Sequence, residues 1–427
     1  MFECVIFMCD YNGQEMKKKT SLQHFLTNAY GFAFFNKLMF LAPVYAIFMQ
    51  NHGMSDMQLS SLFIILSVGT FMMQIPVTWL TNMIGGKYAM IVGQLLKATG
   101  FLLWLFMPNY LGFATGMFLW GIQCAFWNVA FEGLFYDELR ARRHYDIYAR
   151  VLGVRYNVVA AGGALSAMGS LLMFAGYDCI TYITIAILGI SILFLLRIRT
   201  RAKRRNVRGN IRKIHFARLF KTGTKICVQT PCIFLMLVLT LLVSNICYLD
   251  DYLSPIAAQI GVPVVFVGFV QFFILGCTVF GQTFAHRFKR VPDWMLFSLI
   301  CIAGLGYMLF GVFYSIGGLW LLGISYMLFA GIYILLYSRF QDFLPGAYRS
   351  VILSLYSIGD NIVYIFTCLL IGLGGTLGSW RFSLLILGAI LICIGLWALL
   401  FIRDRCTIEH NPNIKRPKTL QHSTNDA

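Results

Sequence analysis

The chain has 427 residues, of which 59% are hydrophobic and only 12% are charged. Because a soluble domain averages about 25% charged residues, this composition excludes a soluble globular protein and indicates a membrane protein with many spans. The net charge of +17 does not imply an acidic partner, because nearly all Lys and Arg fall in segments expected on one side of a bilayer, where anionic lipid favours them.

A basic segment near the middle of the chain organises the rest. Residues 197–225 contain twelve Lys or Arg residues and no Asp or Glu, and strongly apolar sequence lies on both sides. Lys and Arg are retained on the cytoplasmic side of a membrane, so the segment predicts a cytoplasmic connection between two apolar halves. A nucleic-acid patch is the alternative, but membrane helices flank the segment directly and its few aromatic and glycine residues do not form an RNA-binding motif.

A spanning helix needs about 20 mostly apolar residues. Twelve such stretches are expected: 28–50, 56–81, 87–107, 111–138, 147–175, 179–197, 229–252, 262–286, 293–314, 318–340, 349–373 and 380–402. They predict a cytoplasmic tail over 1–27, a six-helix bundle over 28–197, a basic linker over 198–228, a second six-helix bundle over 229–402 and a disordered cytoplasmic tail over 403–427.

The loops between these stretches alternate between segments rich in Lys and Arg and segments nearly free of them. This alternation predicts that both termini are cytoplasmic. Residues 1–15 contain acidic residues and lack the features of a signal peptide, and we expect an over-extended start or a disordered tail there. No Cys-x-x-Cys pair occurs, so neither a metal site nor a disulfide framework is expected.

Six helices, a long basic cytoplasmic connection and six further helices resemble the major facilitator superfamily over about residues 20–405. The family's loop between the second and third helices reads E-x-P-x-G-x-x-x-D-x-x-G-R-K. Pro76, Gly85 and Lys87 match it, whereas the acidic positions are Gln74 and Asn82. The resemblance implies a cytoplasmic gate loop that includes Asn82, Gly85 and Lys87. An amide forms weaker hydrogen bonds than a carboxylate, which argues against a latch based on charge.

The fourth stretch ends with Glu132, Leu134, Tyr136, Asp137 and Leu139, which resembles the E-A-L-x-Y-D-x-L ending of a bacterial branch of the superfamily. We therefore expect Asp137 to belong to the cytoplasmic gate and the protein to lie in a bacterial inner (plasma) membrane.

The fifth stretch carries Gly153, Gly162, Gly163 and Gly169 but no proline. It only partly resembles the antiporter motif of drug exporters, and close helix packing is the favoured interpretation of these glycines.

An ionisable side chain within the hydrocarbon normally faces a cavity or a partner. Glu132 and Arg155 lie at matching depths on consecutive helices, so they predict either a static ion pair or a carboxylate whose protonation depends on its distance from Arg155. Asp360 lies roughly 18 Å into the eleventh stretch and Lys37 roughly 14 Å into the first. Because they belong to different halves, they predict a pair that forms in one conformation only.

Three weaker sets complete the candidates. Lys97 lies in the third helix, which the resemblance places at the periphery. Asp250 and Asp251 end the seventh helix as an exposed acidic cap or an outer gate. Aromatic residues that are candidates for lining a substrate cavity are Tyr45, Trp127, Tyr333 and Tyr364.

No P-loop occurs, so ATP does not drive transport directly. The prediction is an all-α secondary transporter, not an enzyme, that works by alternating access without cofactors. Its expected partners are the lipid bilayer, protons and a small-molecule substrate, with no nucleic acid, and we expect a monomer. We expect proton-coupled transport, with export of an amphipathic compound favoured by the aromatic content. Proton-coupled uptake of a small polar or anionic nutrient, which Lys37 and Arg155 suit, is the alternative within this class. A transport-inactive receptor or assembly protein is the alternative from another class.

Overall fold

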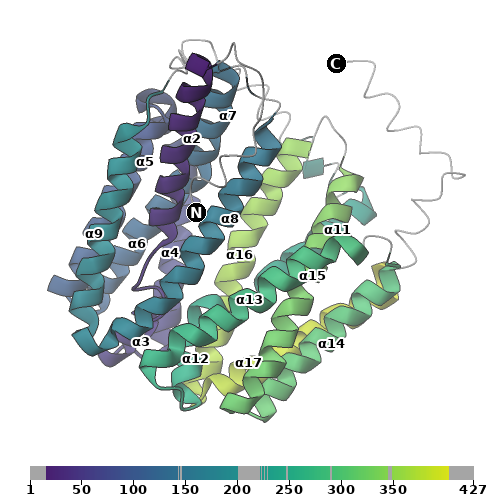
Figure 1. Cartoon of the computed structure of the whole chain (residues 1–427). Coiled ribbons are helices and arrows are strands. Elements are labelled where there is room, and N and C mark those ends of the chain that lie inside the picture. The colour runs from purple at the N-terminus through teal and green to yellow at the C-terminus, as the bar shows by residue number, and fades with distance from the viewer. Residues whose placement is uncertain are drawn as a thin grey trace, which may run out of the picture. The chain divides into compact units, whose positions relative to one another are not determined.

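The computed structural model describes residues 16–142, 144, 147–200, 222, 224, 225, 227, 229–246, 249–288, 291–344 and 349–402. Helices and the turns between them make up this part of the chain, without a strand (Figure 1). Eight segments of it are long and apolar enough to cross a membrane. One of them, Arg150–Arg197, contains two of the expected spans. The prediction of an all-α membrane fold is therefore confirmed.

The remaining three expected spans are helical over shorter stretches. The first is interrupted near Pro43, the fourth divides at a π-helical turn over Trp127–Phe131, and the seventh has a shorter apolar helix over Pro231–Ser244. Proline has no backbone N–H and ends an α-helix, which explains the first interruption.

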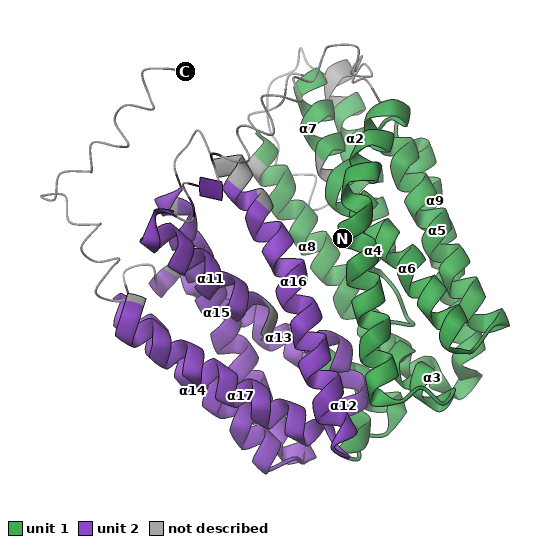
Figure 2. Cartoon of the chain, turned by 180° about the vertical axis from the view of Figure 1, so that it is seen from behind, with its two compact units in different colours: residues 1–210, 257–272 green, residues 211–256, 273–427 purple. Residues whose placement is uncertain are grey.

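The chain forms two compact units (Figure 2). Unit 1 contains residues 1–210 together with 257–272, and unit 2 contains residues 211–256 and 273–427. The basic linker expected over 198–228 lies mostly outside the described residues, and the tail expected over 403–427 lies outside them entirely.

Unit 1 is a helical bundle whose polar caps mark where its helices begin and end. Ser55 and Gln58 form a capping box before the longest helix, and Gly85 ends it with φ at 89°, a conformation that glycine adopts without strain. Its elements are α2 (Met16–Lys37), α3 (Tyr45–Asn51), α4 (Asp56–Ile84), α5 (Gly86–Phe106), α6 (Tyr110–Phe126), η1 (Trp127–Phe131), α7 (Glu132–Ala141), α8 (Tyr148–Ser166), η3 (Ala167–Ala175), α9 (Gly176–Arg197) and η5 (Val264–Phe266).

Unit 2 contains the other helices. Gly304 of α14 and Gly388 of α17 let these two helices approach closely, since a Cβ on Gly388 would lie 2.8 Å from the Gly304 carbonyl oxygen. Its elements are α11 (Pro231–Ile246), η4 (Asp250–Tyr252), η6 (His286–Phe288), α14 (Asp293–Val312), η7 (Ile316–Gly318), α15 (Leu319–Phe343), α16 (Arg349–Thr376), α17 (Trp380–Trp397) and η8 (Ala398–Ile402). The boundary between the units crosses α12 (Leu253–Gln259) and α13 (Val267–Ala285).

The break between α2 and α3 exposes backbone groups inside unit 1, and side-chain hydroxyls bind them. The Met39 N–H donates to Ser166 Oγ at 2.7 Å, and the Leu41 N–H donates to Thr184 Oγ1 at 3.2 Å. Irregular backbone at membrane depth is tolerated only where protein groups or water satisfy it. Ser166 and Thr184, from α8 and α9, therefore stabilise the broken helix.

Two glycines of the fifth expected span pack against the same segment. A Cβ would lie 2.8 Å from the Phe34 carbonyl oxygen at Gly162 and 2.1 Å from the Phe40 carbonyl oxygen at Gly169. The interpretation of these two glycines as close-packing residues is confirmed. Gly153, in contrast, has open space where a Cβ would be.

Replacing Ser166 by alanine is expected to destabilise the protein by about 1 to 3 kcal/mol, because the Met39 N–H would lose its acceptor in a buried site. Chemical unfolding of the purified protein in detergent measures this. Ser191→Ala is the matched control, since Ser191 is equally buried but donates only to Leu188 of its own helix. Equal losses in the two variants would contradict the assigned role of Ser166.

Candidate functional site

One face of α16 carries Tyr356, Asp360 and Tyr364 at intervals of four residues. Residues four apart on an α-helix lie one above the other on the same face. The helix therefore presents a column of polar side chains to its neighbours in unit 2. Tyr333 and Tyr356 belong to α15 and α16, and their hydroxyl oxygens lie 3.2 Å apart.

Asp360 lies within a hydrogen-bonded cluster contributed by three helices. The Ser244 hydroxyl of α11 donates to Asp360 Oδ1 at 2.9 Å. The Tyr356 hydroxyl is hydrogen-bonded to both Ser244 and Tyr333. We call Ser244, Tyr333, Tyr356 and Asp360 the Asp360 cluster.

Close helix packing holds this cluster in place. Gly359 precedes Asp360, and a Cβ at Gly359 would lie 2.6 Å from Leu241 Cδ1 of α11. Glycine at this position lets α16 approach α11 closely enough for a short Ser244 side chain to reach the Asp360 carboxylate. A hydroxyl can donate to a carboxylate or accept from a carboxylic acid, so the cluster can accommodate both protonation states of Asp360.

A second polar contact lies one turn further along α16. The Tyr364 hydroxyl donates to Asp251 Oδ2 at 2.5 Å, and the Cys368 thiol is hydrogen-bonded to Tyr364 and Tyr252. Asp251 is half-buried, and its neighbour Asp250 is exposed. The structure therefore brings together two residues that the sequence assigned separately, one to an outer gate and one to a cavity.

Three basic side chains of unit 1 lie well within expected spans. Lys37 is exposed at the end of α2, with its Cε 3.6 Å from the Cβ position of Gly163. Lys97 is 4% exposed, with its Nζ 5.3 Å from the Trp120 ring centre. Arg155 is also 4% exposed, and its guanidinium lies 4.8 Å from the Tyr156 ring centre. Burial of Lys97 places it inside the bundle, where the aromatic faces offer cation–π contacts.

Two expected charge pairs stay predictions. The side chain of Glu132 lies outside the described part of the structure, so its contact with Arg155 is not observed. Lys37 belongs to unit 1 and Asp360 to unit 2, and each is described only within its own unit.

Two of the candidate cavity aromatics lie in aromatic clusters of unit 1. Tyr45 is 5% exposed, and its ring centre lies 6.0 Å from that of Phe63 and 5.8 Å from that of Trp120. The Trp127 ring centre lies 4.4 Å from that of Phe131.

A network of buried amides lies between α2, α5 and α6. Gln94 Nε2 donates to Asn36 Oδ1 at 2.7 Å, and Gln123 Nε2 lies 3.4 Å from the same oxygen. All three residues are at least nine-tenths buried. Sequence reasoning missed this network. The signal available was the presence of three amides within strongly apolar helices, because buried polar groups require partners.

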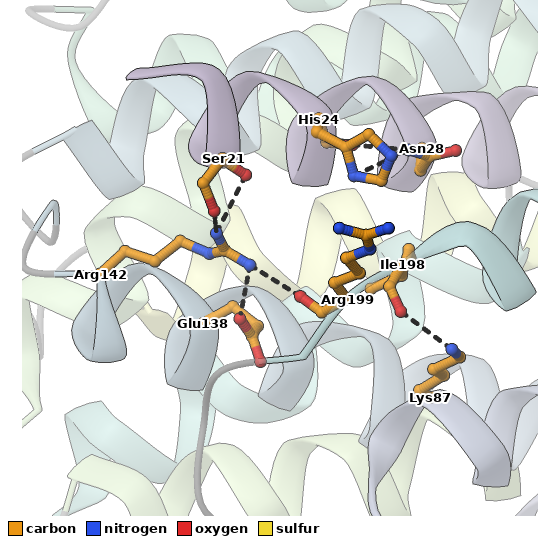
Figure 3. A network of polar contacts seen from close by, with 8 residues as sticks. All are labelled: Ser21, His24, Asn28, Lys87, Glu138, Arg142, Ile198 and Arg199. Carbon is orange, nitrogen blue, oxygen red and sulfur yellow. Dashed lines mark hydrogen bonds and ion pairs between the residues drawn. The ribbon is translucent and has the colours of Figure 1, made fainter. Parts of the chain in front are cut away.

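The expected cytoplasmic gate loop borders a cavity of about 440 Å³ whose lining includes Asn82, Gly85, Lys87 and Asp137. Lys87 Nζ donates to the Ile198 carbonyl oxygen at 2.9 Å (Figure 3). It also donates to the Leu196 carbonyl oxygen at 2.9 Å. A cation near the C-terminal end of a helix binds its free carbonyl groups. Lys87 therefore ties the start of α5 to the end of α9. Asn82 and Asp137 are exposed.

Arg142 forms a second tie in the same region (Figure 3). Its guanidinium donates to Glu138 Oε2 at 3.0 Å, to the Ser21 carbonyl oxygen at 2.9 Å and to the Arg199 carbonyl oxygen at 2.8 Å. The side chains of Glu138 and Arg142 are 0% and 3% exposed. Sequence reasoning missed this pair, although the spacing of four residues between opposite charges on a helix was a usable signal.

The apolar spans and the ionisable residues among them define a polytopic membrane protein. A family model described as Major Facilitator Superfamily matches residues 26–357, well over half of the sequence. The chain belongs to the major facilitator superfamily.

Solved structures of several transporters share the fold. A D-xylose–proton symporter is similar with a TM-score of 0.69 at 12% identity, covering 90% of this chain and 97% of that one. A bacterial homologue of the human lysosomal transporter Spinster gives a TM-score of 0.68 at 14% identity, covering 94% and 100%. The nucleoside transporter NupG gives 0.65 at 12% identity, covering 90% and 98%. At these identities the similarity shows the fold alone.

No curated protein matches the sequence. Family membership and the transporter structures together indicate a secondary transporter rather than an enzyme.

Proposed function

We propose that this protein is a proton-coupled secondary transporter that works by alternating access, with Asp360 as the group that binds the proton. The observation that carries the proposal is the hydrogen bond between Ser244 and Asp360 at 2.9 Å, deep in the α16 helix and within a cluster of hydroxyl groups. An intramembrane carboxylate marks an ion or proton pathway by default. The hydroxyls of the Asp360 cluster can bind its charged and its neutral form, which a site that loads and unloads a proton requires.

The substrate is expected to bind chiefly through unit 1. Lys37 is exposed beside the break between α2 and α3, and discontinuous helices commonly border the binding sites of transporters. Together with Arg155, this cation supports uptake of a small polar or anionic nutrient. Export of an amphipathic compound is the second candidate, and the aromatic side chains support it. Two of these aromatic residues, Tyr333 and Tyr364, form polar contacts in unit 2 through their hydroxyls. Deletion of the gene would abolish accumulation of a nutrient in the first case and raise sensitivity to a compound in the second.

The arrangement in the membrane follows from the same proposal. Two bundles over 28–197 and 229–402 rock about the basic linker, both termini face the cytoplasm of a bacterial cell, and the protein works as a monomer in the inner membrane. The loop with Asn82, Gly85, Lys87 and Asp137 closes the inner side, and Asp250 and Asp251 lie at the outer gate. Glu132 with Arg155, and Lys37 with Asp360, are the ion pairs proposed to change during transport.

Asp360→Asn is expected to abolish proton movement and to leave substrate binding intact, since asparagine keeps the shape of the side chain but does not ionise. A thermal-stabilisation screen with organic anions and amphipathic compounds identifies a ligand. Proton flux is then measured in proteoliposomes with a pH-sensitive dye. Asp178→Asn, at an exposed position in the first turn of α9, is the control. Proton flux in Asp360→Asn equal to that of the unmodified protein would refute the proposal.

A further inference from the structure

Two hydrogen-bonded acidic sites lie in succession along one face of α16. Asp360 accepts from Ser244, and Tyr364 donates to Asp251. Tyr364 follows Asp360 by four residues, which corresponds to about 6 Å along the helix axis. Polar groups on one helix face that do not touch directly can be joined through bridging water.

The second site has access to solvent through its acidic residues, and its phenol belongs to the same helix as Asp360. Asp250 is exposed and Asp251 is half-buried, so protons can reach the Asp251 carboxylate from the aqueous end of α11. A phenol hydroxyl accepts one hydrogen bond while donating another. The Tyr364 hydroxyl is therefore suited to pass a proton on without becoming charged itself.

We propose that the Asp251–Tyr364 pair is a relay that delivers protons to Asp360; this inference rests on the proposed function of Asp360. In the step, the O–H bond of protonated Asp251 breaks as the Tyr364 oxygen accepts that proton. The original O–H bond of Tyr364 breaks at the same time, and its proton passes through a water molecule to an Asp360 carboxylate oxygen. Asp251 ends as a carboxylate, Asp360 ends as a carboxylic acid, and Tyr364 is neutral before and after.

The groups that face the two acids come from several elements. Near Asp251 lie Tyr252 of η4, Tyr364 and Cys368 of α16 and, next to Asp250, Tyr326 of α15. Tyr326 accepts a hydrogen bond from the Leu249 backbone N–H at 2.8 Å, so this hydroxyl holds the start of η4.

On the other side of the relay, Asp360 accepts from Ser244 of α11, and Tyr356 lies beside both. Tyr333 and Tyr337 of α15 contact Tyr356. Cys368 lies two turns from Asp360, and a thiol is a weak donor. Tyr364 is the residue that both binds Asp251 and lies one turn from Asp360.

The test requires no substrate. The purified full-length protein is placed in lipid nanodiscs, a flash-released proton lowers the pH, and time-resolved infrared absorption follows protonation of the carboxyl groups. The Asp360 signal is assigned by its loss in Asp360→Asn. In Tyr364→Phe we expect this signal to reach its normal amplitude about 100-fold more slowly, the lower end of what a positioned proton-transfer group contributes. Added azide, a small proton carrier, should restore the rate.

Control variants separate the relay from general damage. Tyr307→Phe removes a buried phenol hydroxyl of α14 that is bonded to Tyr326, and it should leave the rate unchanged. Asp251→Asn should slow protonation of Asp360 as Tyr364→Phe does. An unchanged rate in Tyr364→Phe, or a slow rate that azide does not restore, would overturn the relay. If Asp360→Asn loses none of the infrared carboxyl signals, the role of Asp360 itself is refuted.

Discussion

Replacing Arg142 by alanine is expected to lower the free energy of unfolding by about 3 to 5 kcal/mol, the cost typical of removing one partner of a buried ion pair. Glu138 is fully buried, so its carboxylate would remain in a low-dielectric site without the guanidinium. The carbonyl oxygens of Ser21 and Arg199 would also lose a charged donor. Chemical unfolding in detergent measures the change.

The position of Arg142 explains why the effect should be large. Its side chain joins the start of α2, the end of α7 and the residues after α9, and its guanidinium lies 5.1 Å from the Phe25 ring centre. Arg140→Ala provides the control, because Arg140 lies in the last turn of α7, two residues before Arg142, but is exposed. If both variants unfold at the same denaturant concentration, the Arg142 network does not stabilise unit 1.

Gly268→Ala is expected to destabilise unit 1 by about 1 to 3 kcal/mol or more, as an overpacked core site does. A Cβ at this position would lie 1.7 Å from the Ala167 carbonyl oxygen and 2.5 Å from Ser170 Oγ. Backbone cannot move aside as a flexible side chain does, so the start of α13 must separate from η3. The thermal unfolding midpoint of the purified protein reports the loss.

Separation of these elements would also break two hydrogen bonds. Ser170 Oγ accepts from the Gly268 N–H at 3.0 Å and donates to the Val265 carbonyl oxygen at 2.8 Å. Gly276→Ala is a matched control on the same helix, because open space surrounds its Cβ position and alanine favours helix formation over glycine. If the thermal unfolding midpoint of Gly268→Ala is as high as that of Gly276→Ala, the close contact between Gly268 and Ala167 does not stabilise unit 1.

Hydropathy alone predicted most of the helices, because a bilayer requires long apolar stretches whatever their neighbours are. It predicted a continuous helix over 28–50, which the structure breaks near Pro43. Pro43 favours the break, and tertiary contacts stabilise it: Ser166 and Thr184, more than 120 residues away, supply the hydroxyls that bind the freed N–H groups. Without these partners an unwound segment at that depth would be costly.

The candidate site was predicted in part. Asp360, Tyr333, Tyr364 and Asp251 were selected as ionisable or aromatic residues near apolar helices, and the structure places all four in the polar contacts of unit 2. Ser244 was missed, because a serine in an apolar helix usually bonds to its own backbone and gives no signal in the sequence.

By itself the sequence determined that the chain crosses a membrane repeatedly. It also predicted which charged residues lie at depth, because transfer of charge into hydrocarbon is costly and such residues are rare. Tertiary structure decided which groups meet. Ser244 and Asp360 are 116 residues apart and Asp251 and Tyr364 are 113 apart. Their contact depends on how α11 and α16 are rotated about their axes, and packing at Gly359 and Leu241, which no local sequence pattern encodes, sets that rotation.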